Sequence, residues 1–253
     1  MSDPSATPEA LAIELDHVTK YFDGRKVLDD VTLDVPRGEA FCLLGRSGTG
    51  KSVTLKHIVG LMKPDRGRVI VHGKDVPRLD RTELTDVRRC MGFLFQNAAL
   101  FDSISVGENV AFPLRRHTEW PDQKIRATAR ERLEAVGLGE DYEKMPAELS
   151  GGMRKRAGLA RAMALDPDIL LVDEPSAGLD PITSAEIDEL LVEQRNKGTT
   201  VVMVTHNIPS ARHVATDLAF LHEGKVIARG SAADLERSEH ELVRAFMQSE
   251  GGG

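Results

Sequence analysis

The sequence has few cysteines and no long apolar run. Its only cysteines are Cys42 and Cys90. They stand in apolar segments without the spacing of metal ligands or of a disulfide framework, so we expect buried free thiols in a reducing compartment. No apolar run approaches the roughly 20 residues that are needed to span a bilayer. We therefore expect a soluble protein that acts at a membrane only through a partner.

An excess of positive charge is also lacking. The chain has 33 lysine and arginine residues against 40 aspartate and glutamate residues, a net charge of -7. Proteins that bind nucleic acid usually have a basic surface, so we expect no nucleic-acid partner, although the composition leaves a local basic patch open. Residues 1–12 contain no positively charged n-region, which predicts a disordered lead-in and not a signal peptide.

The strongest chemical signal is a glycine-rich loop between an apolar run and a helical segment. The run Ala40–Leu44 precedes the sequence GRSGTGKS, and apolar residues at helical spacing follow it. This is the pattern G-x-x-x-x-G-K-[ST], in which backbone N–H groups and a helix N-terminus hold phosphate. We expect Lys51 to reach the β- and γ-phosphates and the Ser52 hydroxyl to face Mg²⁺. The predicted nucleotide-binding residues of this loop are Gly45, Arg46, Ser47, Gly48, Thr49, Gly50, Lys51, Ser52 and Val53.

The hydrophobic pattern predicts an α/β fold whose core comes from both ends of the chain. A helical pattern covers residues 106–164, and another helix is expected over residues 184–195. Strands are expected over residues 13–18, 27–35, 68–72, the run ending near 95, 169–172, 200–205, 218–222 and 226–228. This order favours a flanked parallel sheet, an antiparallel N-terminal layer and an inserted helical block.

An apolar strand that ends in two acids predicts a second part of the site. The sequence is ILLVDE, from Ile169 to Glu174. In a doubly wound sheet, the carboxyl ends of the strands face the ligand crevice. We expect Asp173 to hold Mg²⁺ through water and Glu174 to take a proton from the attacking water.

The stretch LSGGM (Leu149–Met153) places a serine and two glycines at a helix start, which fits either a second anion-binding site or an ordinary N-cap turn.

Six motifs in this order resemble an ABC transporter ATPase. They are the phosphate loop, Gln96 in Phe95–Asn97, LSGGM, the strand ending in Asp173 and Glu174, Ser176–Asp180, and His206. The resemblance covers residues 13–230. It implies an ABC-type P-loop ATPase with a RecA-like core, in one domain over residues 13–236 whose helical subdomain spans about 97–165. Residues 237–253 would then form a C-terminal tail.

The resemblance also implies a head-to-tail dimer that holds two ATP molecules. Each ATP would lie between the phosphate loop of one subunit and the turn of the other that contains Ser150, Gly151, Gly152 and Met153. The two helix N-termini that face each other would be neutralised by the ATP anion.

Further roles follow from the same resemblance. Gln96 would contact Mg²⁺ and water and sense the transporter partner, and His206 would contact the γ-phosphate. Asp180 would cross the dimer to the opposite site. Phe22 would stack on adenine, with Tyr21 as the alternative if the register shifts by one residue.

Met153 departs from the common signature, which has glutamine at this position. Methionine lacks the side-chain donor of glutamine, so a contact on the ribose side is in question. Met153 and the amino-acid sequences of residues 94–102 and 106–118 resemble the corresponding positions of the Mla-type ATPases of MCE-associated lipid transporters. This resemblance implies a peripheral subunit at the cytoplasmic face of the inner membrane that drives an integral-membrane permease for phospholipid or another hydrophobic lipid. An MCE-domain protein and a small regulatory subunit are further expected partners.

Several alternatives stay open. Ala98, Leu100 and Phe101 either dock the permease or fill the seam between helical block and core. The helical stretch 239–248, with Leu242 and Phe246 on the same face as Ala245, packs either on its own chain or on the neighbouring subunit. The rival functions are an importer ATPase for a non-lipid substrate and a soluble ABC ATPase that acts on nucleic acid. A small-molecule kinase or GTPase would leave LSGGM and His206 unexplained.

Overall fold

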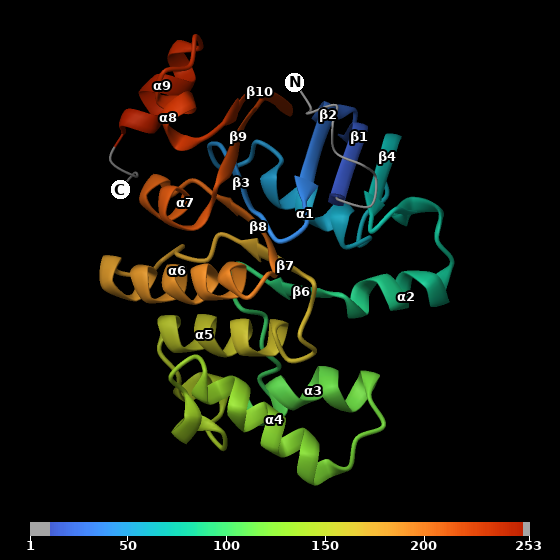
Figure 1. The fold of residues 1–253 in the computed structure, drawn as a ribbon, viewed down its shortest axis with the longest axis vertical. Helices are drawn as coiled ribbons and strands as arrows, with labels where there is room; N and C mark the ends of the chain where they lie inside the picture. The colour runs from blue at the N-terminus through green and yellow to red at the C-terminus, as the bar shows by residue number, and fades with distance from the viewer. Residues whose placement is uncertain (1–10, 250–253) are drawn as a thin grey trace.

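Two β-sheets organise the protein, which we describe from a computed structural model covering residues 11–249 (Figure 1). The larger sheet has the order β10-β9-β3-β8-β7-β6, and the smaller has the order β2-β1-β4-β5. The larger sheet contains β3 (Ala40–Leu44), β6 (Met91–Leu94), β7 (Ile169–Asp173), β8 (Thr200–Thr205), β9 (Asp217–His222) and β10 (Lys225–Gly230). The smaller contains β1 (Leu11–Phe22), β2 (Arg25–Pro36), β4 (Arg66–Val71) and β5 (Lys74–Asp75).

The parallel strands of the larger sheet bring the ends of three motifs to one edge. Strands β3, β7 and β8 are buried along their whole length, as expected for continuous apolar runs in a parallel sheet. Their register pairs Leu44 with Thr205 and Asp173 with Val204. The phosphate loop, the acidic pair and His206 therefore all follow strands that end side by side.

The N-terminal hairpin forms as the sequence predicts, with a longer first strand. Strand β1 begins at Leu11, two residues before the expected start, so Leu11 and Ala12 of the predicted lead-in are part of the sheet; residues 1–10 lie outside the described residues. Asp23 and Gly24 connect β1 to β2, both with positive φ (49° and 77°). An Asp-Gly pair of this kind is the usual two-residue hairpin turn. The smaller sheet packs its apolar face against α1 (Lys51–Ile58) and the larger sheet.

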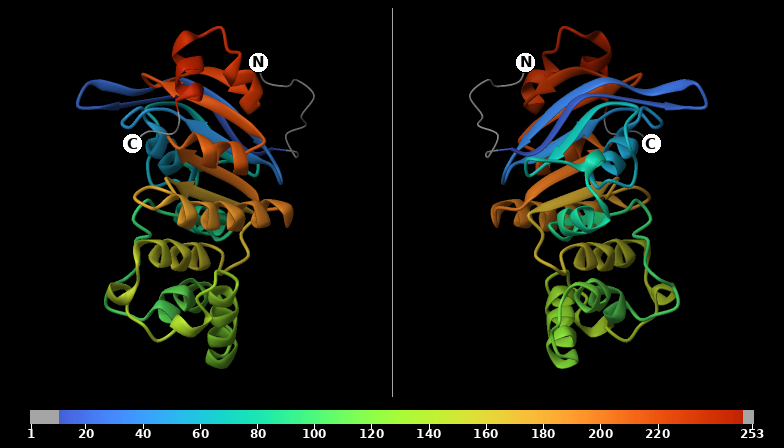
Figure 2. Two further views of the ribbon diagram at one scale, coloured as in Figure 1. Left: turned by 90° about the vertical axis from the view of Figure 1, so that its left-hand side faces the viewer. Right: turned by 90° about the vertical axis from the view of Figure 1, so that its right-hand side faces the viewer.

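The inserted helices form a block at one end of the molecule, opposite the C-terminal helices (Figures 1 and 2). The block consists of α3 (Val106–His117), α4 (Asp122–Glu134) and α5 (Gly151–Ala162). The remaining helices are α2 (Arg81–Arg89), α6 (Pro181–Asn196), α7 (Ile208–Val214), α8 (Ala232–Glu236) and α9 (Glu241–Gln248), with short 3₁₀ turns at Val76–Arg78, Gly139–Asp141 and Pro146–Glu148. Within the described part of the chain, no helix combines the length and apolar character needed to cross a membrane.

The C-terminal helix α9 packs on its own chain. Val243 and Met247 are buried, and the ring of Phe246 meets Phe220 edge-on, with 4.8 Å between ring centroids. Leu242 is half-buried and Ala245 is exposed, so the predicted face is only partly covered. This helix therefore has contacts on its own chain, and contact of the tail with the neighbouring subunit stays a prediction.

Candidate nucleotide-binding and catalytic site

The phosphate loop has a backbone shape that excludes side chains at two positions. Gly45 has φ +154° and Gly50 has φ +110°. A Cβ at Gly45 would lie 2.4 Å from the carbonyl oxygen of Leu221, and one at Gly50 would lie 2.8 Å from Leu28 Cδ2. Thr49 Oγ1 donates to the carbonyl of Arg46 at 2.9 Å and closes the loop. Helix α1 begins directly after Gly50, so its free N–H groups open into the loop, as a phosphate cradle requires.

Lys51 projects back into the loop that precedes it. Its Nζ donates to the carbonyl oxygens of Gly45 at 2.8 Å and Arg46 at 3.1 Å. The same atom lies 3.3 Å from Glu174 Oε1, and both side chains are buried. The ammonium group is therefore placed between the phosphate loop and the end of β7, where the γ-phosphate of a bound nucleotide is expected.

Ser52 and Asp173 together offer oxygen ligands that suit Mg²⁺. Ser52 Oγ donates to Asp173 Oδ1 at 2.8 Å. Burial raises the pKa of Asp173, and the Ser52 hydrogen bond opposes that rise. A bound cation would favour the charged carboxylate that burial disfavours. A carboxylate and a hydroxyl are oxygen donors of the kind that bind Mg²⁺ together with phosphate oxygens.

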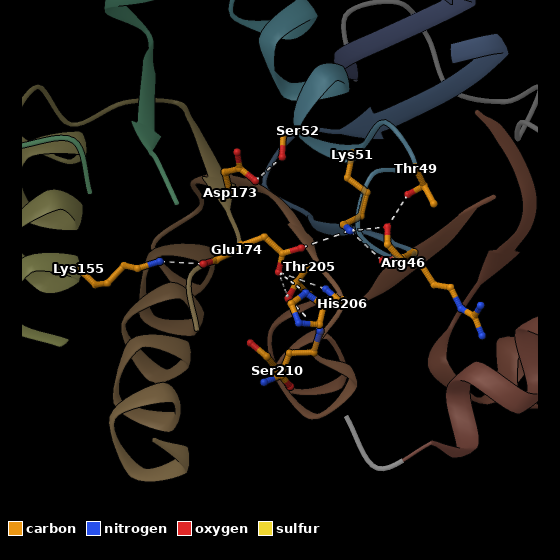
Figure 3. A network of polar contacts seen from close by, with 12 residues as sticks. Arg46, Thr49, Lys51, Ser52, Lys155, Asp173, Glu174, Thr205, His206 and Ser210 are labelled. Carbon is orange, nitrogen blue, oxygen red and sulfur yellow. Dashed lines mark hydrogen bonds and ion pairs between the residues drawn. The ribbon is translucent and has the colours of Figure 1, made fainter. Parts of the chain in front are cut away.

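The carboxylate of Glu174 is held by groups from the end of β8 (Figure 3). Its Oε2 accepts hydrogen bonds from Thr205 Oγ1 at 3.0 Å and from the backbone N–H of His206 at 3.3 Å. His206 Nδ1 lies 2.9 Å from the same oxygen, without the alignment of a hydrogen bond. Glu174 itself has φ 46°, in the left-handed region that non-glycine residues rarely adopt. A strained backbone with a fully engaged carboxylate is typical of a catalytic position.

One cavity gathers many of the predicted residues. Its lining includes Val27, Ser47, Gly48, Gly50, Lys51, Ser52, Val53, Gln96, Glu174 and His206. Asp173 meets this cavity through its bond to Ser52. The structure therefore brings together the phosphate loop, Gln96, the acidic pair and His206 as expected.

The predicted adenine residues do not line this cavity. Phe22 and Tyr21 are each 38% exposed at the end of β1. The Lys20 ammonium lies 5.6 Å from the Phe22 ring centroid, and the Lys26 ammonium lies 5.9 Å from that of Tyr21. Adenine stacking therefore stays a prediction for either ring.

The turn Ser150–Met153, called the signature turn below, lies beside the Ser176–Asp180 segment and not at the phosphate loop of its own chain. Ser150 caps α5, and its Oγ accepts from the N–H of Met153 at 3.2 Å. A Cβ at Gly152 would lie 2.3 Å from Thr183 Cγ2, and one at Gly151 would lie 3.6 Å from Leu179. The contact at Gly151 is an ordinary van der Waals distance, so it is Gly152 that lacks room for a side chain where the helical block meets the start of α6.

Asp180 has a structural task in addition to its predicted one. Its carboxylate accepts from the backbone N–H groups of Ile182 and Thr183, each at 3.0 Å, and from Thr183 Oγ1 at 2.7 Å. These bonds, the Thr183 hydroxyl first, lower the pKa of Asp180. It is the N-cap of α6, so any contact across a dimer would be made by a carboxylate that already accepts hydrogen bonds from Ile182 and Thr183.

An apolar groove adjoins the site between β6 and the helical block. Phe101 is 46% exposed in it, and its ring lies 4.9 Å from that of Phe112. Leu100 is half-buried, and Ala98 is buried, so Ala98 fills the seam and does not belong to the exposed patch. The lining is Met91, Gly92, Phe93, Phe95, Ala99, Phe101, Phe112, Pro113, Arg161, Ala162 and Leu165.

Three residues near the site were not anticipated from the sequence. Val27 enters the cavity lining from β2, Thr205 donates to Glu174, and Lys155 donates to the Glu174 carbonyl oxygen at 2.8 Å. Thr205 could have been predicted from the sequence, because a hydroxyl at a strand end next to His206 faces the same crevice. Val27 and Lys155 could not have been predicted, since each reaches the site through contacts between distant segments. Cys90 also differs from expectation, being half-buried, whereas Cys42 is buried.

The fold and site define a P-loop ATPase with a signature turn on an inserted helical block, and comparison with known proteins agrees. The profile of the family described as "ABC transporter" matches residues 28–177, and the chain belongs to that family. A solved dimeric structure of the ATP-binding cassette MJ0796 bound to ADP and Pi superposes with a TM-score of 0.81 at 35% identity, covering 87% of this chain and 98% of that one.

Two curated relatives are similar over most of the chain. The "Intermembrane phospholipid transport system ATP-binding protein MlaF" of Escherichia coli (strain K12) is 42% identical over 88% of this chain and 83% of its own length. The "Probable ribonucleotide transport ATP-binding protein mkl" of Mycobacterium leprae (strain TN) is 44% identical over 95% of this chain and 70% of its own length.

Proposed function

We propose that this ATPase powers a transporter of phospholipid or another hydrophobic lipid, as a peripheral subunit at the cytoplasmic face of the inner membrane. The observation that carries the lipid substrate is the 42% identity to MlaF over 88% of the chain. Met153 in the signature turn and the sequences of residues 94–102 and 106–118 support the same substrate class. The expected partners are an integral-membrane permease, an MCE-domain protein and a small regulatory subunit.

The proposed reaction assigns each group at the strand ends a task. The N–H groups of the phosphate loop and Lys51 bind the triphosphate, Glu174 accepts the proton of the attacking water, and His206 contacts the γ-phosphate. Mg²⁺, held by Ser52, Asp173 and Gln96, would supply charge neutralisation at the phosphates. Catalysis then consists mainly of positioning and electrostatic stabilisation.

We infer a head-to-tail homodimer from the place of the signature turn. In the described part of the chain, Ser150–Met153 contribute nothing to the lining of the cavity that holds the phosphate loop. A capped helix start with free N–H groups can bind an anion, and the ATP bound by a second copy would supply one. The dimeric MJ0796 cassette supports such an arrangement.

The groove around Phe101 is the proposed docking site for the permease. It is apolar and partly exposed, and it lies next to Gln96, so a partner seated there would be close to the nucleotide site. Exposed apolar clusters of this kind commonly mark protein contacts.

Ribonucleotide is the second candidate cargo, because the mkl relative carries that name at 44% identity. The ATPase subunit would not touch the cargo in either case, so the choice is made with the whole transporter. The experiment is reconstitution of the chain with its permease in proteoliposomes, followed by ATP-dependent movement of a fluorescent phospholipid or a radiolabelled ribonucleotide. Lipid movement that stops in the Glu174→Gln variant is expected. Ribonucleotide movement without lipid movement would overturn the lipid substrate, and co-purified RNA or DNA without a permease would overturn the transporter assignment.

A further inference from the structure

Lys155 links helix α5, which begins at the signature turn, to the end of strand β7, where Glu174 follows. It lies on α5, two residues after Met153, and its side chain is 5% exposed. Its Nζ donates to the backbone carbonyl oxygen of Glu174 at 2.8 Å (Figure 3). This bond joins the helical block to the end of β7, and Lys155 also lines a neighbouring cavity together with Gln96 and Leu179.

The surroundings of Lys155 are those of a buried cation with acidic neighbours. Burial lowers its pKa to about 8, while the charges of Asp173 and Glu174 act in the opposite direction. An ammonium group in such a place costs more free energy than an apolar residue that fills the same space. Packing alone therefore does not account for a lysine here.

The backbone that Lys155 contacts is the part of Glu174 that most needs support. Glu174 has φ 46°, a left-handed conformation that is unfavourable for an L-residue other than glycine. Its N–H donates to Val204 at 2.9 Å, and its carbonyl accepts from the Ala177 N–H at 3.2 Å as well as from Lys155. The peptide groups on both sides of the catalytic carboxylate are thus fixed, one by β8 and the other chiefly by α5.

We propose that Lys155 is a positioning residue that couples the two ATP sites of the dimer through α5. The proposal rests on the head-to-tail dimer of the proposed function. There the turn Ser150–Met153 contacts the ATP held by the partner subunit, while Lys155, one helical turn or so further along, holds Glu174 of its own site. ATP bound in one site would thereby bring the glutamate of the other site into position for hydrolysis.

The test compares variants of Lys155 in the intact transporter, reconstituted with its permease. Lys155→Met keeps the length and removes the charge and the donor, whereas Lys155→Gln keeps a donor. Lys124→Met, on the exposed face of α4, is the matched control from the same helical block. The readouts are kcat, KM for ATP, the Hill coefficient of hydrolysis, and ATP affinity in the Glu174→Gln background.

For Lys155→Met we expect kcat to fall at least about tenfold, because Glu174 is no longer held in position for hydrolysis. The Hill coefficient should fall towards 1, while ATP affinity in the Glu174→Gln background stays within about twofold, a small free-energy change. Lys155→Gln should recover part of kcat, and Lys124→Met should behave as wild type.

Unchanged kcat and cooperativity in Lys155→Met would overturn the proposal, as would a loss confined to ATP affinity. If Lys155→Met does not fold, Lys155→Gln decides by the same readouts. A wild-type protein that hydrolyses ATP as a monomer with a Hill coefficient of 1 would overturn both the proposed dimer and the coupling of sites. In that case the kcat of the Lys155 variants still reports whether the residue positions Glu174.

Discussion

The ammonium group of Lys51 lies 3.3 Å from Glu174 Oε1, so the lysine proposed to bind phosphate and the glutamate proposed as the catalytic base form an ion pair. A bound γ-phosphate needs the same ammonium group and would compete with the carboxylate for it. Part of the binding free energy of ATP is therefore spent on separating this pair. The pairing also keeps the carboxylate directed at the place where the γ-phosphate arrives.

Replacement of Glu174 by Gln should separate binding from catalysis. The amide no longer competes as a charge for Lys51, so the Kd of a non-hydrolysable ATP analogue should fall several-fold, as titration calorimetry would measure. Hydrolysis should fall by about 100-fold or more, as expected for loss of a general base. Glu186→Gln, on the exposed side of α6, should change neither quantity. Wild-type turnover in Glu174→Gln would refute the assignment of the base.

Removal of Mg²⁺ should act through Ser52 and Asp173. With EDTA we expect ATP binding to persist and hydrolysis to stop. Ser52→Ala removes one ligand and the donor to Asp173, so the Mg²⁺ concentration for half-maximal hydrolysis should rise about tenfold, within the range that loss of a metal-site group costs. The measurement is ATPase rate against free Mg²⁺. Ser210→Ala, a hydroxyl on α7 bonded to Asp188, is the control for a serine outside the metal site. An unchanged Mg²⁺ requirement in Ser52→Ala would contradict this assignment.

The parts of the site that the sequence predicted are those set by local pattern and strand direction. Asp173 ends a buried parallel strand, and Lys51, Glu174 and His206 come after the ends of such strands. The ends of neighbouring parallel strands meet at one edge of the sheet. The phosphate loop needs only its own glycines. Each of these motifs spans only a few consecutive residues, so each can be recognised in the sequence alone.

The parts that were missed depend on contacts between distant segments. Lys155 stands in a basic helical run, and only the packing of α5 on the core shows that its amino group reaches Glu174. Helix α2 was missed because its sequence is rich in charge and buries only Val87. It is recognisable afterwards from the capping box of Asp80 and Glu83. Phe22 is exposed because it lies at the far end of the hairpin, and the length of the hairpin could not be predicted from the local sequence.

The groove at Phe101 should control assembly with the permease. Phe101→Asp places a charge in an apolar contact, so we expect the permease to co-purify poorly and the lipid-transport rate to fall. The ring is 46% exposed, so the melting temperature of the isolated chain should change little. Leu61→Asp, at a residue 55% exposed outside the groove, should leave assembly intact. Normal co-purification of Phe101→Asp would exclude this groove as the docking site.

The two cysteines should differ in how fast they are alkylated and in how the rate depends on pH. Burial raises the pKa of both the Cys42 and the Cys90 thiols. Because the thiolate is the nucleophile, a raised pKa leaves less reactive sulfur at pH 8 and moves the rise in rate to higher pH. Half-buried Cys90 should react slowly with iodoacetamide, and its rate should continue to rise to higher pH than the rate of glutathione does. Buried Cys42 should react only when the protein is unfolded in guanidinium. Peptide mass spectrometry against a glutathione reference gives both rates. Rapid labelling of Cys42 in the native protein at pH 8 would contradict its burial between β8 and β9 in the larger sheet.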